Sequence, residues 1–249
     1  MSDNIHLTVD SLAGNVYDLA GVLEAIHDLA GLKPFLRFEL ALAHGVVPVA
    51  QVMCGDVSLE FLEQARGHRP AGASHIVRVV VEVPNREPAV RELEPGLWLA
   101  VRPGPKTRVA EVEVRSSAVA EDLAVLQACG GAVTEEGVLT LGEVQVRFAP
   151  APGAEPVADP DQSLPGWHRL GLAHPRLEEA VAALVRAGAA VVVPPYRVLP
   201  GLREAMLRLP SGLVVQPVEQ KLWQMLPTIA VKGLAARLTG RPLRFKTTT

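Results

Sequence analysis

Cysteine and aromatic residues are scarce in this 249-residue chain, which has two cysteines and 4% aromatic residues. Cys54 and Cys129 lie far apart and belong to no CxxC pattern, so we interpret both as buried small hydrophobes rather than as a disulfide or a zinc site. The sequence also lacks a GxSxG elbow, a phosphate-binding glycine loop followed by lysine, and a dinucleotide fingerprint. Few aromatics and an acidic body argue against nucleic-acid binding.

Long apolar runs are missing as well. No segment approaches the roughly 18 uninterrupted apolar residues that a membrane helix needs, and the start MSDNIHLTVD has no basic or apolar export segment. We therefore expect a cytoplasmic protein without a transmembrane segment. With 49% hydrophobic and 20% charged residues, the chain can bury one large core or two ordinary ones.

Acidic residues are absent after Glu219, whereas six basic residues follow it and the formal net charge of the whole chain is −3. Residues 221–249 therefore form a basic C-terminal extension that contains the apolar stretch LWQMLPTIAVKGLAARL. We expect it to dock on the acidic body or on a second subunit, with an anionic surface as the alternative, and we expect Pro227 and Gly233 to interrupt any long helix.

A β-α-β-β-β order appears clearly at both ends of the remaining chain. The strand IHLTVD, a helix that begins near Asn15 and ends at Gly31, and the strands LRFELALA, VVPVAQVMC and VSLEFLEQ make the first module. Residues 167–220 repeat this order with HRLGLAH, LEEAVAALVRAG, AVVVPP, REAMLRL and GLVVQPV. Such internal repetition predicts a modular architecture.

Two weaker copies lie between these modules. Residues 108–150 contain a strand, a helix AVAEDLAVLQACGG and two further strands, whereas residues 74–103 are degenerate, with HIVRVVVEV, a short helix from about Arg86 to Leu93, and one clear strand, LWLAV. A Pro-rich linker spans residues 150–166. We predict an α+β fold with curved, mainly antiparallel sheets and helices on their outer faces.

Polar residues recur at equivalent places in these modules. His6, His75 and His168 open first strands, while Glu60 and Gln216 lie near the ends of last strands. Because side chains alternate along a strand, a polar first residue and a polar late residue can point into one concave sheet face. Each lone histidine can also be a hydrogen-bonded core or rim residue, and Glu60 can be an edge-strand residue that faces water.

The repeated modules, the leading histidines and the final LPSGLVVQPVEQ resemble the vicinal oxygen chelate superfamily, most closely its methylmalonyl-CoA epimerase and glyoxalase I branch. The superfamily also contains extradiol dioxygenases and bleomycin resistance proteins. The resemblance covers about residues 5–220 and implies two domains of paired modules, 1–105 and 106–220. Each pair would form a cup in which strand residues bind a divalent metal ion, here Zn, Ni, Co, Mn or Fe.

Carried over by this resemblance, His6, Glu60 and His75 are the metal ligands of the first cup. Because the superfamily often places its catalytic base at the fourth ligand position, Glu60 or a metal-bound hydroxide would have to serve as the base here. The fourth ligand position falls in LWLAV, which offers no ligand. His168 and Gln216 match ligand positions of the second cup, but Ala110 and Val146 stand where its other ligands would be. Two neutral ligands alone hold a metal poorly, so we interpret the second cup as structural or as a binding pocket.

Three arginines, at positions 69, 78 and 102, could bind an anionic substrate near the first cup, although surface ion pairs explain them as well. His27 and His44 fit the pattern less well, and we treat both as solvated.

The leading functional hypothesis is a metal-dependent lyase or isomerase that stabilises an enolate of a small carbonyl or acyl substrate. The alternatives are an Fe(II) extradiol-type dioxygenase and a metal-free protein that sequesters a small molecule, like the resistance members of the superfamily. Whether the cups form within one chain or across a homodimer stays open.

Overall fold

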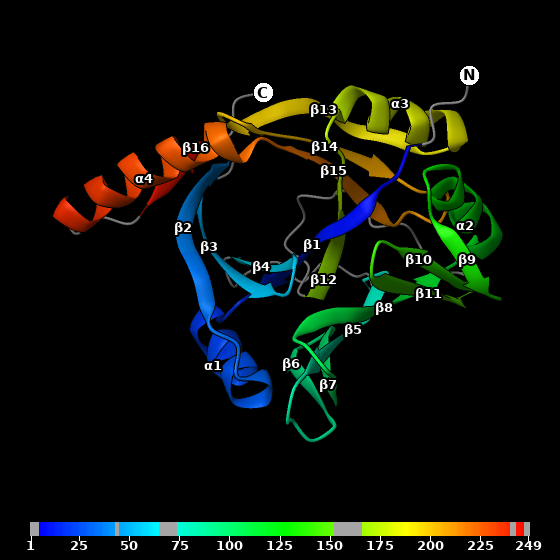
Figure 1. The fold of residues 1–249 in the computed structure, drawn as a ribbon, viewed down its shortest axis with the longest axis horizontal. Coiled ribbons are helices and arrows are strands. Elements are labelled where there is room, and N and C mark those ends of the chain that lie inside the picture. Colours follow the sequence, from blue (N-terminus) through cyan, green and yellow to red (C-terminus); the bar gives the residue numbers. More distant parts are fainter. Residues whose placement is uncertain (1–4, 43–44, 65–73, 152–165, 240–242, 247–249) are drawn as a thin grey trace.

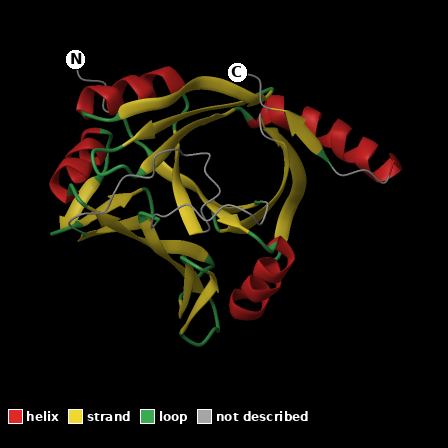
Figure 2. Ribbon diagram, turned by 180° about the vertical axis from the view of Figure 1, so that it is seen from behind, coloured by secondary structure: helices red, strands yellow, loops and turns green. Residues whose placement is uncertain are grey.

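The computed structural model describes residues 5–42, 45–64, 74–151, 166–239 and 243–246. Its strands join into one large curved sheet, and the helices of the repeated modules lie on the outer side of that sheet (Figures 1 and 2). The predicted α+β class is confirmed. Within the described ranges, no helix combines the length and the hydropathy that spanning a bilayer requires.

The first and fourth modules have the predicted order. The first contains β1 (Thr8–Val16), α1 (Leu19–Ala30), β2 (Pro34–Leu42), β3 (Gly45–Cys54) and β4 (Val57–Glu63). The fourth contains β12 (Gly166–Ala173), α3 (Leu177–Ala187), β13 (Ala190–Leu199), β14 (Leu202–Arg208) and β15 (Val214–Gln220). Helix α1 begins later than predicted, because Asp18 caps it by accepting from Gly21 N (3.0 Å), and it ends at Gly31, whose φ of 71° favours glycine.

The middle modules are smaller. The second contains β5 (Ile76–Val83), β6 (Ala89–Glu94) and β7 (Leu97–Pro103). The third contains β8 (Arg108–Ser116), α2 (Val119–Ala128), β9 (Ala132–Glu135), β10 (Val138–Leu141) and β11 (Val144–Pro150). The helix predicted from Arg86 to Leu93 is wrong, since most of this segment is β6. Pairing with β7 satisfies its backbone groups, whereas so short an isolated helix is marginal.

The modules pair in an order that differs from the expected one. Strand β1 of module one pairs antiparallel with β12 of module four, and β5 of module two pairs antiparallel with β8 of module three. The strands of modules one and four therefore form one curved unit in the order β2-β3-β4-β1-β12-β15-β14-β13. The resemblance implies that module one shares a cup with module two. In the structure, module one instead pairs with module four.

Small residues allow β1 and β12 to approach closely. A methyl group added at Gly171 would lie 2.0 Å from Ser11 Oγ, and one added at Gly14 would lie 2.8 Å from Leu97 Cδ1. Ser11 and Gly171 face each other in the strand pair. A side chain at Gly171 would have to displace the hydroxyl of Ser11 on the facing strand, and one at Gly14 would meet Leu97 of β7.

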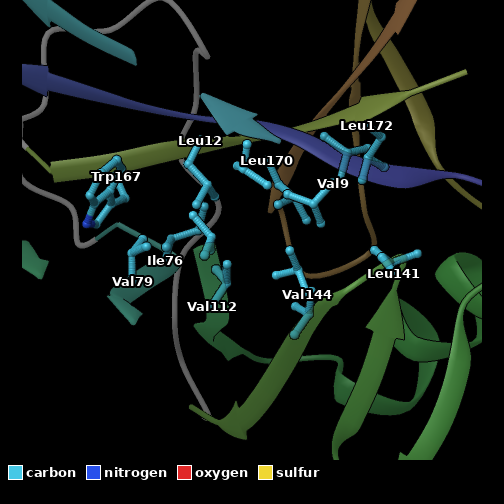
Figure 3. Close-up of a cluster of buried hydrophobic side chains, with 14 of the residues drawn as sticks. Val9, Leu12, Ile76, Val79, Val112, Leu141, Val144, Trp167, Leu170 and Leu172 are labelled. Carbon is cyan, nitrogen blue, oxygen red and sulfur yellow. The ribbon is translucent and has the colours of Figure 1, made fainter. Parts of the chain in front are cut away.

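The paired strands β1 and β12 have two different faces. Leu12, Leu170 and Leu172 are buried on one face against residues of modules two and three, among them Val79, Val112 and Leu141 (Figure 3). On the other face, Ser11, Ala13 and Arg169 line a cavity. Because side chains alternate along a strand, one strand pair supplies both the central core and the floor of a cup.

The basic C-terminal extension folds as α4 (Leu222–Thr239) and β16 (Arg244–Lys246). The expectation that Pro227 would interrupt the helix is wrong, because α4 continues through it. A proline inside a helix removes one backbone hydrogen bond, at a cost of about 3 kcal/mol. Packing of Met225 and Ile229 against a buried cluster offsets this cost.

Trp167 should contribute strongly to stability, because it joins three modules. It is fully buried, its ring lies 5.4 Å from that of Phe61, and its Nε1 donates to the carbonyl of Trp98 (3.0 Å). Trp167→Phe should lower the free energy of unfolding by about 2 to 4 kcal/mol, measured by urea denaturation. The same change at Trp223, which is 73% exposed, should have an effect below about 0.5 kcal/mol. Equal effects of the two substitutions would contradict this arrangement.

Candidate functional site

Modules one and four enclose a cup with a volume of about 450 Å³. Its floor is formed by β1, β4, β12 and β15, and its walls come from β2, β13, β14, α4 and β16 (Figure 1). The floor carries polar side chains, whereas the walls are mainly apolar. The apolar lining includes Leu36, Phe38, Leu40, Met206, Met225, Ile229 and Phe245. A concave apolar site with a few polar groups is typical of small-molecule binding.

An ion pair crosses the floor between the two modules. Arg169 Nη2 lies 3.7 Å from Glu60 Oε1, with exposed fractions of 9% and 21% for the two side chains. In the sheet, Ala13 lies between them, because it pairs with Glu60 on one side and with Arg169 on the other. The small side chain of Ala13 leaves room for the guanidinium to reach the carboxylate. Glu60 also accepts from Gln51 Nε2 (3.0 Å).

Glu204 is the most perturbed acid of the cup. It accepts from Tyr196 Oη (2.8 Å) and from Gln216 Nε2 (2.6 Å). Burial and the nearby charge of Glu60 raise its pKa to about 7, although both hydrogen bonds and the charge of Arg169 act in the opposite direction. Near neutral pH this carboxyl group can therefore either donate or accept a proton.

Asp10 and His168 lie at the edge of the same floor. Burial, followed by the charge of Glu60, raises the pKa of Asp10 to about 6, and its carboxylate accepts from Gln220 Nε2 (3.0 and 3.1 Å). Burial and the adjacent charge of Arg169 hold the pKa of His168 well below its ordinary value, so His168 is neutral. The cup is thus lined by the carboxyl groups of Asp10, Asp56, Glu60 and Glu204 and by the guanidinium of Arg169.

The structure brings some of the candidate site residues together in the cup and places others elsewhere. Glu60, His168 and Gln216 all line the one cup of modules one and four. His6 instead lies beside Gly130 after α2, and His75 donates from Nδ1 to the carbonyl of Arg115 (3.1 Å); neither is among the residues that line the cup. The structure therefore does not bring His6, Glu60 and His75 together.

A divalent metal, which the resemblance implies, does not fit these residues. In the part of the chain that the structure describes, no three or more His, Cys, Asp or Glu side chains are grouped so that they could hold a metal ion. The cation Arg169 already faces Glu60, and Glu204 accepts from two neutral donors. An iron site of the dioxygenase type would need the same kind of grouping.

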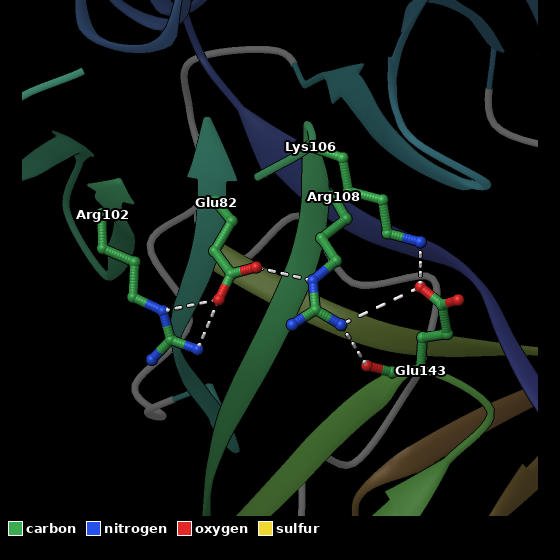
Figure 4. Close-up of polar contacts among 5 residues, drawn as sticks. All are labelled: Glu82, Arg102, Lys106, Arg108 and Glu143. Carbon is green, nitrogen blue, oxygen red and sulfur yellow. Dashed lines mark hydrogen bonds and ion pairs between the residues drawn. The ribbon is translucent and has the colours of Figure 1, made fainter. Parts of the chain in front are cut away.

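The arginines suggested as anion binders have acidic partners. Arg78 pairs with Glu113, and Arg102 and Arg108 pair with the two oxygens of Glu82 (Figure 4). These pairs lie on β5, β7 and β8 of modules two and three, and none of their residues is among those that line the cup. The ion-pair interpretation accounts for them, while Arg69 and His44 lie outside the described residues.

Sequence reasoning missed Glu204, Arg169 and Tyr196. Leu202, Glu204 and Met206 alternate along β14 and line the cup. The available signal was therefore one acid between two apolar residues on the same strand face. Arg169 directly follows the singled-out His168, and a bulge in the pairing of β12 with β1 lies next to it. Neither signal indicates by itself which modules share a cup.

Solved structures of known proteins share this fold. The chain is similar to glyoxalase I from Zea mays (TM-score 0.64, 11% identity, covering 86% of this chain and 92% of that one). It is also similar to a Bacillus subtilis protein that bears a provisional dioxygenase name (TM-score 0.61, 9% identity, covering 87% and 86%). No family model and no curated protein matches the sequence. At these identities the likeness concerns the fold alone, and it confirms the predicted vicinal oxygen chelate fold.

The raised pKa of Glu204 should make the protein less stable as pH rises. Between pH 4.5, its ordinary pKa, and about 7, the unfolded chain releases this proton while the folded chain keeps it. The free energy of unfolding should therefore fall by on the order of 2 to 3 kcal/mol between pH 5 and 8 through this group. In Glu204→Gln that part of the fall should vanish, as measured by urea denaturation at both pH values.

Asp10 titrates in both proteins, so its contribution cancels in this comparison. Parallel pH profiles for the wild type and the variant would show that Glu204 has an ordinary pKa.

Proposed function

We propose that the cup of modules one and four transfers a proton to and from a small carbonyl compound without a metal ion, as an isomerase or lyase would. Glu204 is the acid and base, and Arg169 faces the negative charge that develops on the carbonyl oxygen. The observation that carries this proposal is a carboxyl group with a pKa near 7 inside an apolar-walled cup that also contains a buried guanidinium.

The reaction step follows from these groups. Glu204, when ionised, takes a proton from the carbon next to the carbonyl group. The electron pair of the broken C–H bond forms a carbon–carbon double bond, and the π pair of the carbonyl group moves to its oxygen to give an enolate. The positive charge of Arg169 lowers the free energy of this enolate in a cup of low polarity. Return of the proton from Glu204 to the same carbon regenerates the carbonyl compound. Its configuration is inverted when the planar enolate turns in the cup and receives the proton on its opposite face.

Arg169 would thus take the role that a metal ion plays in stabilising the negative charge on the enolate oxygen. Arg169 lies on the first strand of module four, and its partner Glu60 lies on the last strand of module one. Arginine stays protonated at all physiological pH values and donates in a planar fork, which suits an oxyanion. This supports chemistry on oxygen rather than on an apolar substrate alone.

A second candidate is a metal-free binding protein. It is favoured by the mainly apolar walls and by the size of the cup, because both suit retention of a small molecule without any reaction. The two candidates differ in what Glu204 does, since binding to apolar walls does not need its proton.

Hydrogen exchange distinguishes these candidates. The α-protons of 2-octanone, followed by proton NMR in deuterium oxide, should exchange faster with the wild-type protein than in buffer. Glu204→Gln should slow the catalysed exchange by about 100-fold or more, because general acid–base catalysis contributes roughly that factor. Glu24→Gln, the same change at an exposed position of α1, is the control and should have no effect.

Treatment with EDTA should leave the exchange unchanged. Exchange that depends on added metal would contradict the metal-independent mechanism, and 2-octanone that binds without exchange would favour the binding protein.

Tyr196 should set the pH at which Glu204 works. Its hydroxyl donates to Glu204 and favours the ionised carboxylate, so Tyr196→Phe should raise the pKa of Glu204 above its value of about 7. The midpoint of the pH–rate profile of exchange should move upward by several tenths of a unit to about one unit. A loss of rate at every pH with an unchanged midpoint would assign Tyr196 a different role.

A further inference from the structure

The basic C-terminal extension lies at the open edge of the cup. Strand β16 pairs in parallel with β2 of module one, with Phe245 opposite Leu40, and Glu39 N donates to the carbonyl of Leu243 (2.7 Å). Strand β16 also contacts β13, the outermost strand of module four. The extension therefore connects the two outer edges of the curved unit, which lie beside each other in Figure 1.

Phe245 is the anchor of this connection. It is buried with Leu199 of module four and Leu243, and its ring packs edge to face on Phe38 of module one at 5.3 Å between centroids. The ammonium group of Lys232 in α4 lies 4.7 Å above the same ring. The extension is thus held by packing on both modules.

The same extension forms part of the cup's inner surface. Met225, Leu226 and Ile229 of α4 line the cup together with Phe245 of β16. All four side chains are apolar, whereas Glu204 and Arg169 belong to its polar part. Phe35 and Leu226 are 73% and 60% exposed, which gives the cup an apolar rim.

We infer that α4 and β16 form the apolar end wall of the cup through Met225, Leu226, Ile229 and Phe245, and make it selective for molecules that carry a long alkyl or similarly apolar group. The polar end of such a molecule faces Glu204 and Arg169, a placement that rests on the proposed function, while the apolar end packs on α4 and Phe245. The apolar end wall follows from the lining residues alone, whatever reaction the cup performs. Each buried methylene group should strengthen binding about three- to fourfold, because it removes apolar surface from water.

The experiment compares two homologous series, from four to ten carbon atoms, by isothermal titration calorimetry on the full chain. The 2-alkanones carry a carbonyl group and the 1-alkanols do not. Affinity should rise with chain length in both series. In Leu226→Asp, which places a carboxylate in the end wall, the longest members should bind at least tenfold more weakly and the shortest should be unaffected.

Val231→Asp is the matched control, since Val231 lies on the same helix, is 69% exposed and is not among the residues lining the cup. Circular dichroism of both variants checks that the helix is intact. Affinities that do not depend on chain length, or equal losses in the two variants, would overturn the end wall. Chain-length dependence without α-proton exchange of the 2-alkanones would support the end wall and contradict the proposed function.

Discussion

The close antiparallel pairing of β1 with β12 is the constraint on which the other features depend. Gly171 leaves room for the hydroxyl of Ser11 on the facing strand, and Gly14 leaves room for Leu97 of β7. Because the strand pair is buried on one face and lines the cup on the other, the same ladder holds the core and aligns Ser11, Ala13 and Arg169. A larger residue at Gly171 would therefore disturb the floor of the cup, where Ser11 lies.

The charges of the floor follow from that alignment. Ala13 allows Arg169 to lie close to Glu60, so two residues more than 100 positions apart form an ion pair on the floor of the cup. The negative charge of Glu60 in turn raises the pKa values of Glu204 and Asp10, which burial already raises. Folding thus places an acid that titrates near neutral pH beside a permanent cation. The C-terminal extension adds apolar surface at the far wall and makes the cup amphipathic.

Local pattern predicted most of the elements, and strand alternation predicted which positions carry chemistry. The helix stripe before Gly31, the strands of modules one, three and four, and the inward direction of Glu60 and Gln216 are all local properties. The partner of each module is not local, because β1 could pair with the first strand of any other module by the same pattern. For that reason the sequence pattern groups His75 with Glu60, whereas in the structure His75 contacts the carbonyl of Arg115, and the pattern does not indicate Glu204 although it predicts its strand.

The central claim, that the cup holds Glu204 as an acid poised near neutral pH, is tested most directly by the titration of that carboxyl group. Carbon-13 NMR of protein labelled at the glutamate side-chain carboxyl, with Glu204→Gln used to assign the resonance, gives its pKa without any substrate. The expected midpoint is about 7. A midpoint near the ordinary glutamate value of 4.5 would contradict the arrangement of the floor and the proton transfer proposed for it.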